Sequence, residues 1–406
     1  MTDPRPLPFP VVDNCMQIGG ISLVRLAQRV GRTPFYAYDR TMLTRRVLEL
    51  RDTLPRCIRL HYAVKANPMP ALVQHMAGLV DGFDVSSAGE LKVALDTVLP
   101  AHAVSFSGPG KGEDALSRAV AAGALLNIES PRELERVARI GDRLGLRPRV
   151  ALRINPDFEL KSSGMRMGGG AKPFGVDAEQ APAVLREIGR LGLDFEGLHV
   201  FSGSQCLNAE AIMEAQAHTL ALAMRLSGHM PQPLRLLNMG GGFGVPYFPG
   251  ESALDAAPIG EHLAALADRL AAHAPEASIA LELGRFLVSE AGIYVARITD
   301  RKVSRGRTFL IADGGMHHHL AASGNLGQVI RKNYPVVIGN HVRATETETV
   351  TISGPLCTPL DIIADNVTLP RTDVGDLVVV LQSGAYGLSA SPTGFLGHPL
   401  PEEVLV

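Results

Sequence analysis

The peptide HYAVKANP (residues 61–68) places a lysine, Lys65, directly after an apolar strand. Burying an ammonium group removes its hydration, which lowers the pKa of the amine and makes it available for Schiff-base chemistry. A lysine that merely extends into solvent from the end of the strand explains this peptide, taken alone, equally well.

A run of three glycines marks a second position where chemistry is expected. The peptide NMGGGFG (residues 238–244) ends a strand, and Gly241 and Gly242 lie inside it. Glycine lets backbone N–H groups approach an anion closely, and a following helix N-terminus adds a favourable dipole. A tight turn is the alternative for this peptide alone, but with Lys65 and Arg285 after other strands the pattern favours a phosphate group.

The elements that would position these residues alternate between short apolar strands and helix-like segments. Eight strands are expected, at residues 59–66, 82–87, 103–108, 125–130, 149–155, 196–204, 234–242 and 277–284. Between them, Ser130 and Gly141 read as the two ends of a helix. Eight such units predict an α/β fold with a (β/α)8 TIM-type barrel, in which phosphate groups often bind after the seventh strand. An open, doubly wound sheet is the alternative.

The pattern changes after residue 290, where long helical periods are absent. The stretch 293–315 reads as a hairpin that turns at 304–306, and 346–357 and 376–386 read as further strands. We therefore expect a C-terminal, mainly antiparallel β domain. The expected domains are a barrel at 40–290 and a β domain made of 1–39 and 291–406.

Composition and charge exclude several classes of protein. Of the 406 residues 46% are apolar and 20% charged, and the formal net charge is -2, so neither nucleic acid nor an anionic membrane is an expected partner. The N-terminus has no signal-peptide pattern, and no apolar run is long enough to span a bilayer. The four cysteines form no CxxC pair, which predicts a reduced, cytoplasmic setting.

Several motifs resemble the pyridoxal-5′-phosphate (PLP) decarboxylases of the alanine-racemase fold (type III), the family of diaminopimelate, ornithine and arginine decarboxylases. The resemblance covers almost the whole chain. Its motifs are YAVKAN (62–67), GFDVSSAGEL (82–91), GLHVFSGSQ (197–205), GGGFG (240–244), ELGR (282–285), DGGM (313–316), GPLC (354–357) and GAYG (384–387). Within the family, DGGMHHH, GPLCTP and the segment 383–401 are most similar to the carrier-protein-linked glutamate decarboxylase of butirosin biosynthesis. They also resemble decarboxylases of exopolysaccharide and siderophore clusters.

The resemblance implies a role for individual residues. Lys65 carries PLP as a Schiff base, and Glu282 pairs with the pyridine nitrogen and keeps it protonated. Asp84 lies beside the Lys65 end of the cofactor. Cys357, reaching across the interface of a homodimer with shared active sites, protonates the carbanion left by decarboxylation. The phosphate is held by a set of residues from both parts of the chain, namely Ser204, Gly241, Gly242, Arg285 and Tyr386.

The chain also departs from the family pattern. Phe201 replaces a histidine that stacks on the cofactor ring, so stacking survives and a titratable neighbour is lost. Thr358 replaces the acidic residue that usually follows the cysteine, which argues against ornithine or lysine as the substrate. After DGGM the chain continues as HHHLAASGNLG in place of an arginine-containing segment, which argues against diaminopimelate.

Two further segments have less specific patterns. Three consecutive histidines, His317 to His319, do not easily converge on one metal ion if they lie in a strand, so no metal is expected and His318 or a neighbour is expected to contact substrate. Residues 165–175 read as a flexible loop at the barrel mouth. Its Arg166 and Lys172 either meet an anionic substrate or carrier arm or are simply solvated.

The function expected from these observations is PLP-dependent α-decarboxylation of an L-amino acid, free, conjugated or bound to a carrier protein, in a specialised pathway. Diaminopimelate decarboxylation in primary metabolism is one alternative. An amino-acid racemase is another, although racemases of this fold pair the ring nitrogen with arginine, where this chain has Glu282. A non-catalytic PLP-binding protein is the third, but single-domain carriers of that kind lack a β domain.

Overall fold

The chain forms two compact units, a barrel unit and a β unit. A computed structural model describes residues 7–160, 162–326, 328, 331–343 and 345–406, with only the backbone of Ser163 and Arg166. The barrel unit comprises Arg45–Val245 and Ser252–Leu287, and the β unit comprises Met1–Thr44, Pro246–Glu251 and Val288–Val406. That the chain divides into separate domains near residues 40 and 290 stays a prediction.

Within the described residues, eight parallel strands close into a barrel, which confirms the predicted fold class. Around the barrel their order is β9-β12-β14-β15-β5-β6-β7-β8, and β8 pairs with β9 to close it. In chain order the strands are β5 (Ile58–Ala63), β6 (Gly82–Val85), β7 (Val104–Phe106), β8 (Leu125–Ile128), β9 (Arg149–Asn155), β12 (Asp194–Val200), β14 (Leu236–Gly241) and β15 (Ser278–Leu283). β5 ends before Lys65, which lies in a short 3-10 turn, Val64–Ala66, rather than in the strand.

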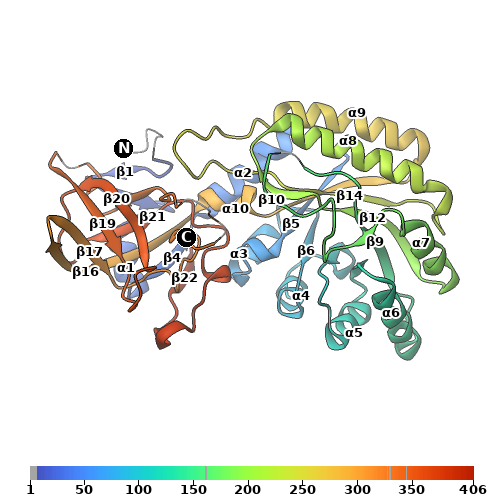
Figure 1. The fold of residues 1–406 in the computed structure, drawn as a ribbon, viewed down its shortest axis with the longest axis horizontal. Coiled ribbons are helices and arrows are strands. Elements are labelled where there is room, and N and C mark those ends of the chain that lie inside the picture. The colour runs from blue at the N-terminus through green and yellow to red at the C-terminus, as the bar shows by residue number, and fades with distance from the viewer. Residues whose placement is uncertain (1–6, 161, 327, 329–330, 344) are drawn as a thin grey trace. The chain divides into compact units, whose positions relative to one another are not determined.

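Helices follow the strands and cover the outside of the barrel (Figure 1). They are α3 (Pro70–Met76), α4 (Ala88–Leu95), α5 (Glu113–Ala122), α6 (Pro131–Leu144), α7 (Ala181–Arg190), α8 (Ala209–Leu226) and α9 (Ala257–His273). Two more, α2 (Arg40–Thr53) and α10 (Arg285–Val288), join the two units along the chain. Side-chain caps begin several of them, because Ser87, Ser130 and Asn208 accept hydrogen bonds from the first turns of α4, α6 and α8.

The expected end of α6 at Gly141 is wrong. The helix continues to Leu144 and ends at Gly145, which adopts the left-handed conformation (φ 65°) that glycine tolerates best. Gly141 serves a packing purpose instead, because a side chain there would press against the ring of Pro148. A glycine within a helical pattern can therefore either end the helix or make room for a neighbouring residue. Here Gly145 ends the helix and Gly141 makes room for Pro148.

The barrel interior changes from apolar to polar along its axis. One buried cluster consists of Leu125, Ala151, Leu236 and Ala280. Two residues further along the same strands stand Asn127, Arg153, Asn238 and Glu282, all buried. Because side chains two apart in a strand share a face, these polar residues form the next layer toward the carboxyl ends of the strands.

The β unit is a mainly antiparallel sheet, as predicted. Its strands are β4 (Phe35–Tyr38), β16 (Gly292–Ser304), β17 (Arg307–Ala312), β18 (Val336–Ile338), β19 (Thr347–Ser353), β20 (Ile362–Pro370), β21 (Leu377–Val380) and β22 (Glu402–Leu405). The predicted hairpin joins β16 and β17, and β4 from the N-terminal region pairs with β16. A small sheet of β1 (Val11–Val12), β2 (Cys15–Ile18) and β3 (Ile21–Ser22) precedes helix α1 (Leu23–Val30) in this unit.

The segment expected as a flexible loop at 165–175 is partly a strand. β10 (Ser163–Arg166) pairs antiparallel with β13 (Gly203–Cys206), and after it residues 167–175 lead to β11 (Val176–Asp177), which pairs with β9. The prediction for the Arg166 side chain lies outside the described residues. Lys172 lies between β10 and β11, without regular structure.

Gly197 tests how closely the barrel strands approach one another. A Cβ atom there would overlap the backbone carbonyl of Leu236 on β14. We expect Gly197→Ala to lower the free energy of unfolding by about 1–3 kcal/mol, because backbone cannot move aside cheaply. Urea denaturation followed by circular dichroism measures it. Gly228→Ala, where no atom lies near the added methyl group, is the control, and equal midpoints for the two variants would contradict the packing argument.

Candidate active site

Several of the residues singled out in the sequence gather at the carboxyl ends of the barrel strands. The Nζ atom of Lys65 lies 3.8 Å from Oδ2 of Asp84 on β6 and 5.2 Å from the centre of the Phe201 ring, just after β12. The Lys65 side chain is about a third exposed (36%), whereas Asp84 is fully buried. An amine thus stands at the mouth of the barrel between a carboxylate and an aromatic ring.

Glu282, near the end of β15, is held ionised at the bottom of this site. Its two carboxylate oxygens accept hydrogen bonds from Nε2 of His199 (3.2 Å) and Nδ2 of Asn238 (2.5 Å), and the side chain is almost completely buried. Burial alone would raise the pKa of Glu282, but its interactions with His199 and Lys65 outweigh burial and lower that pKa to about 2.

The pKa of Asp84 is shifted in the opposite direction, upward. Its Oδ1 accepts hydrogen bonds from the hydroxyls of Ser105 and Ser107 (3.0 Å each), while Oδ2 has no hydrogen-bond partner among the described residues. Burial and the charge of Glu282 raise the pKa of Asp84 to about 6, although Lys65 opposes the shift. Two nearby carboxyl groups therefore differ in affinity for protons, and Glu282 is the more acidic.

The glycine run after β14 leaves no room for side chains. A Cβ atom at Gly241 would overlap the carbonyl of Glu282, and one at Gly242, whose φ is +86°, would press on the carbonyl of Gly203. The backbone of this turn is therefore packed against both the β12 and β15 sides of the barrel mouth. Such a turn presents backbone rather than side chains, as the phosphate prediction requires.

Gln205 fastens the turn after β12 to the glycine run. Its side-chain amide donates to the carbonyl of Val245 (2.6 Å) and accepts from the N–H of the same residue (3.1 Å). Next to it, the N–H of Cys206 donates to the carbonyl of Gly242 (2.8 Å). Gln205 adopts a left-handed backbone conformation (φ 59°), which is uncommon for a residue with a side chain. The predicted phosphate residues Ser204, Gly241 and Gly242 thus lie on two turns that are tied together.

Arg285 starts α10, two residues after Leu283 ends β15. The preceding Gly284 packs against Ala63 and Ala66, on either side of Lys65 in sequence. The ELGR motif is therefore adjacent to the lysine turn within the barrel unit. The roles of Arg285 and Ser204 toward phosphate stay predictions.

The remaining predicted site residues lie in the β unit. Cys357 is exposed, and Thr358 follows it in a turn that is organised by Asp361. The Asp361 carboxylate accepts hydrogen bonds from the N–H groups of Met316 (2.6 Å) and Leu356 (2.8 Å), which joins the DGGM and GPLC motifs. Tyr386 has a left-handed backbone (φ 53°) in the GAYG motif. All three segments belong to the β unit.

The three consecutive histidines lie in a turn rather than in a strand, and all are buried. His318 Nε2 donates to the carbonyl of Pro399 (2.9 Å), and His319 contacts Ser383 (3.0 Å). Both ring nitrogens of His317 lack a hydrogen-bond partner in the described part of the chain. A substrate contact by His318 stays a prediction. Among the described residues, no group of three or more His, Cys, Asp or Glu side chains is arranged to hold a metal ion.

A second layer of polar residues supports this site, and its members His199, Asn238 and Lys111 were not predicted from the sequence. His199 and Asn238 hold Glu282. Glu129, directly after β8, accepts from Arg153 (2.7 Å) and from the N–H of Gly175 (3.1 Å). Lys111, also buried, pairs with Glu133 (3.0 Å). A single polar residue near the end of an otherwise apolar barrel strand is the signal that could have identified His199 and Asn238.

The raised pKa of Asp84 predicts a pH-dependent effect of its replacement. Between pH 3.8 and about 6 the folded state binds more protons than the unfolded state, so ionisation of Asp84 destabilises the fold as pH rises. We expect Asp84→Asn, in protein stripped of small ligands, to raise the free energy of unfolding at about pH 7.5 by about 1–3 kcal/mol, and by less at about pH 4.

Urea denaturation at the two pH values measures this difference. Asp142→Asn, at an exposed position on α6, is the matched control for the change of side chain. An Asp84→Asn gain of equal size at both pH values would show that Asp84 does not titrate in this range.

Comparison with known proteins agrees with this site. The family model described as "Pyridoxal-dependent decarboxylase, pyridoxal binding domain" matches residues 40–289. The chain is 38% identical to an L-glutamyl-[BtrI acyl-carrier protein] decarboxylase of Niallia circulans, over 96% of this chain and 92% of the relative. It is 32% identical to a diaminopimelate decarboxylase of Aquifex aeolicus, over 97% and 91%.

Solved structures of decarboxylases share the fold of this chain. The crystal structure of a diaminopimelate decarboxylase from Helicobacter pylori, complexed with L-lysine, matches with a TM-score of 0.82 and 26% identity, over 94% of each chain. Within the described residues no helix is long and apolar enough to cross a membrane. From the family match over the barrel and the relatives that align along nearly the whole chain, this protein belongs to the pyridoxal-dependent decarboxylases and is a PLP-dependent carboxy-lyase.

Proposed function

We propose that this enzyme removes the α-carboxyl group of a glutamate-like amino acid that is attached to an acyl-carrier protein. The observation that carries the proposal is the 38% identity over nearly the full length to a decarboxylase named for such a substrate. Thr358 and the histidine segment after DGGM support it, because neither supplies the charged groups expected for diamine precursors or diaminopimelate.

The barrel site fits PLP on three observations. An amine, Lys65, stands at the mouth beside a buried carboxyl oxygen of Asp84 that has no hydrogen-bond partner among the described residues. Glu282 is ionised and almost completely buried, which suits a partner for a protonated ring nitrogen. Gly241 and Gly242 form a turn in which no side chain blocks the backbone. Each observation matches a different part of the cofactor.

In this proposal each residue has a defined task. Lys65 binds the cofactor covalently, Phe201 stacks on its ring, and Glu282 holds a proton at its ring nitrogen. The N–H groups of Gly241 and Gly242 face its phosphate, and the other phosphate contacts come from the side chains of Ser204, Arg285 and Tyr386. When bound, PLP supplies an electron sink for the electron pair that is released as carbon dioxide departs.

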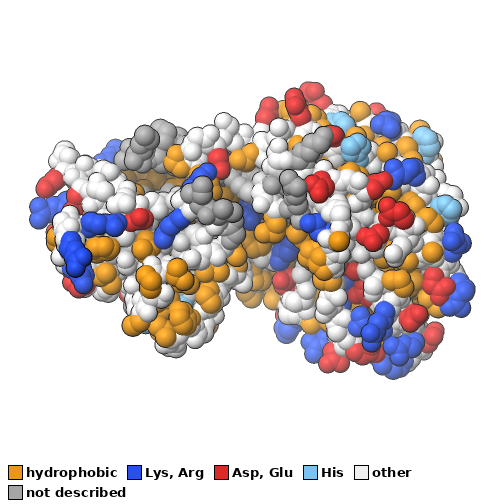
Figure 2. Space-filling model, viewed as in Figure 1, with side chains coloured by type: hydrophobic (Ala, Val, Ile, Leu, Met, Phe, Trp, Pro, Cys, Tyr) orange, Lys and Arg blue, Asp and Glu red, His pale blue; other side chains and the backbone are white. Residues whose placement is uncertain are grey.

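The product requires a proton on the α-carbon, and we assign its delivery to Cys357. The thiol is exposed in the β unit, so it is accessible to a reacting group. We place the site at the interface of a homodimer, with Cys357 contributed by the partner subunit. Exposed Phe395, Leu396 and Leu400 support an interface. Figure 2 shows hydrophobic side chains, in orange, gathered over the late segment of the β unit that is red in Figure 1. A proton-donating thiol must stay reduced, which favours a cytoplasmic setting.

The substrate proposal is tested by carbon dioxide release from free L-glutamate, L-ornithine, meso-diaminopimelate and L-glutamate loaded on an acyl-carrier protein. We expect the loaded carrier protein to give a kcat/KM at least about tenfold above that of each free amino acid. Turnover of diaminopimelate at the highest kcat/KM would contradict the proposal and leave the family assignment intact.

Thr358→Asp gives a sharper version of this test. Restoring an acidic side chain next to Cys357 should raise kcat/KM for ornithine and lysine about 5–50-fold, because a carboxylate attracts their distal ammonium group. Thr358→Ser is the matched control and should leave the substrate preference unchanged. If the aspartate variant shows the preference of the unsubstituted enzyme, Thr358 does not face the far end of the substrate.

Gln205→Ala tests the attachment of the phosphate turn. Loss of its two hydrogen bonds to Val245 should loosen the glycine run and weaken PLP binding about 5–100-fold, with kcat at saturating PLP much less affected. Equilibrium dialysis of PLP against the apoenzyme measures it. Gln74→Ala, an exposed site on α3, is the control. An unchanged PLP affinity would show that the attachment has no role in phosphate binding.

Shared active sites predict complementation between two inactive variants. Lys65→Ala lacks the covalent attachment and Cys357→Ala lacks the proton donor, so each homodimer should be nearly inactive. Mixed dimers contain one site in which both residues are intact, and activity should return after the variants are unfolded and refolded together. Mixtures that stay inactive, although mass spectrometry detects mixed dimers, would place Lys65 and Cys357 of one site on the same subunit.

A further inference from the structure

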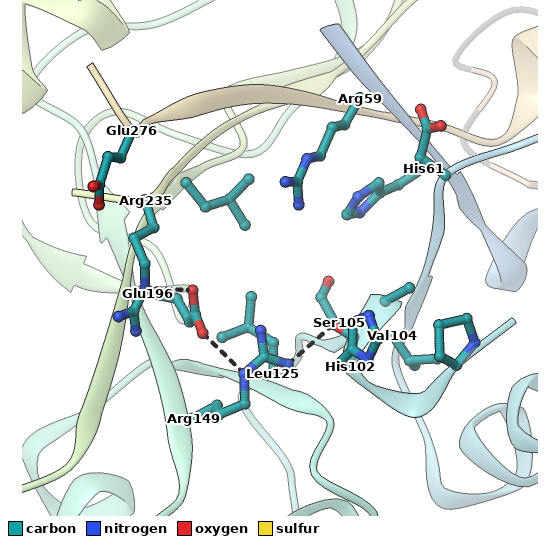
Figure 3. A pocket seen from close by; sticks show the side chains of 14 residues that line it. Arg59, His61, His102, Val104, Ser105, Leu125, Arg149, Glu196, Arg235 and Glu276 are labelled. Carbon is teal, nitrogen blue, oxygen red and sulfur yellow. Dashed lines mark hydrogen bonds and ion pairs between the residues drawn. The ribbon is translucent and has the colours of Figure 1, made fainter. Parts of the chain in front are cut away.

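A pocket of about 490 Å³ opens at the amino ends of the barrel strands, the end away from Lys65 (Figure 3). Arg59 at the start of β5 lines it, whereas Lys65 follows the other end of the same strand. Its lining comes from the starts of strands around the barrel, including Arg149 on β9, Arg235 before β14 and Glu276 before β15. The volume is in the range of small-molecule sites.

Most charges that line this pocket already have a partner. Glu196 accepts from Nε of both Arg149 (2.9 Å) and Arg235 (3.0 Å), and Arg235 also pairs with Asp194 (2.7 Å). Asp81 is similarly occupied, because it pairs with an arginine outside the lining, at 2.6 Å, and accepts from the N–H of a residue on β5. In each of these pairs the charge of an arginine is compensated by a carboxylate, and the pairs formed by Glu196 link neighbouring strands of the pocket lining.

Two charges of opposite sign remain. Arg59 and Glu276 both line the pocket, and within the described part of the chain neither forms an ion pair. Figure 3 shows Arg59 extending from β5 toward the middle of the pocket and Glu276 at its edge, in the turn before β15. β5 and β15 are paired there, with Arg59 opposite Ala280. A ligand that compensates both charges must carry an anionic and a cationic group.

His61 provides a third polar contact deeper in the pocket. It is two residues after Arg59 on β5, so both side chains are on the same face of the strand, and it is 6% exposed. Its Nδ1 has no hydrogen-bond partner among the described residues. Burial lowers the pKa of His61, although Glu282 and Asp81 oppose the shift, so the ring is neutral and offers a hydrogen bond rather than a charge. A buried polar atom without a partner is costly unless a ligand or water satisfies it.

We propose that this pocket binds a small zwitterion of the amino-acid class, with its carboxylate at Arg59 and His61 and its ammonium group at Glu276. The arrangement pairs each unmatched group of the pocket with a complementary group of the ligand. The proposal does not depend on which substrate the enzyme decarboxylates. A second amino-acid site at the opposite end of the barrel would let an amino acid bind the enzyme without competing for Lys65.

The test uses holoenzyme that has been reduced with borohydride, so that the amine of Lys65 and the cofactor site are both blocked. Isothermal titration with L-alanine and with 4-aminobutyrate measures binding that remains. We expect Arg59→Gln and Glu276→Gln each to weaken binding of the better of the two ligands about tenfold or more. Arg118→Gln and Glu135→Gln, exposed positions on α5 and α6, are the matched controls and should bind as the unsubstituted protein does.

Ligands with one kind of charge, together with NMR of His61, distinguish a zwitterion site from a simple anion site. Glutarate and propylamine, which carry only one kind of charge, should bind more weakly than the zwitterions. The ring nitrogen signals of ¹⁵N-labelled His61, assigned with His61→Gln, should shift on binding. Glutarate binding that equals zwitterion binding and is insensitive to Glu276→Gln would overturn the proposal in favour of an anion site. Absence of all binding would overturn it and leave Arg59 and Glu276 as solvated charges at the pocket edge.

Discussion

The site depends on keeping two carboxyl groups of opposite tendency inside one closed barrel. Glu282 is ionised because His199 and Asn238 compensate for its lost hydration, and its charge in turn raises the pKa of Asp84. Burying a carboxylate without hydrogen-bond donors would cost too much free energy. Here both donors lie on barrel strands, His199 on β12 and Asn238 on β14. Exposure of the charged side chains therefore falls from Lys65 at the mouth, which is partly exposed, to the buried Asp84 and Glu282.

The architecture explains how such a polar interior remains stable. An apolar layer around Leu125 and Ala280 fills the middle of the barrel, and polar residues take the following inward positions on the same strands. Glycines allow the strands and turns to approach closely at the mouth, where Gly241 and Gly242 pack against neighbouring backbone. Gln205 then ties two turns together, so contacts within the chain fix the backbone that we propose as the phosphate site.

Much of the fold followed from periodicity, because each barrel strand is a short apolar run bounded by turn residues. Whether a segment forms a helix or a strand was therefore predictable, whereas the residues at which elements end were not. Gly141 looked like the end of a helix that in fact continues to Leu144, and the strand expected to contain Lys65 ends at Ala63. Motif resemblance singled out Lys65 and Glu282, which lie at the carboxyl ends of barrel strands. It did not single out His199 and Asn238. Each is a lone polar residue near the end of an apolar strand, but its contact with Glu282 joins positions whose spacing in sequence carries no pattern.

The central claim is that an ionised Glu282 at the ring nitrogen makes carbon dioxide release possible. The most direct measurement is single-turnover carbon dioxide release by Glu282→Gln with PLP bound, its occupancy measured separately. The account predicts that this variant retains PLP and loses at least about a hundredfold in rate, because an uncharged amide cannot keep the ring nitrogen protonated. A rate equal to that of the unsubstituted enzyme would contradict it.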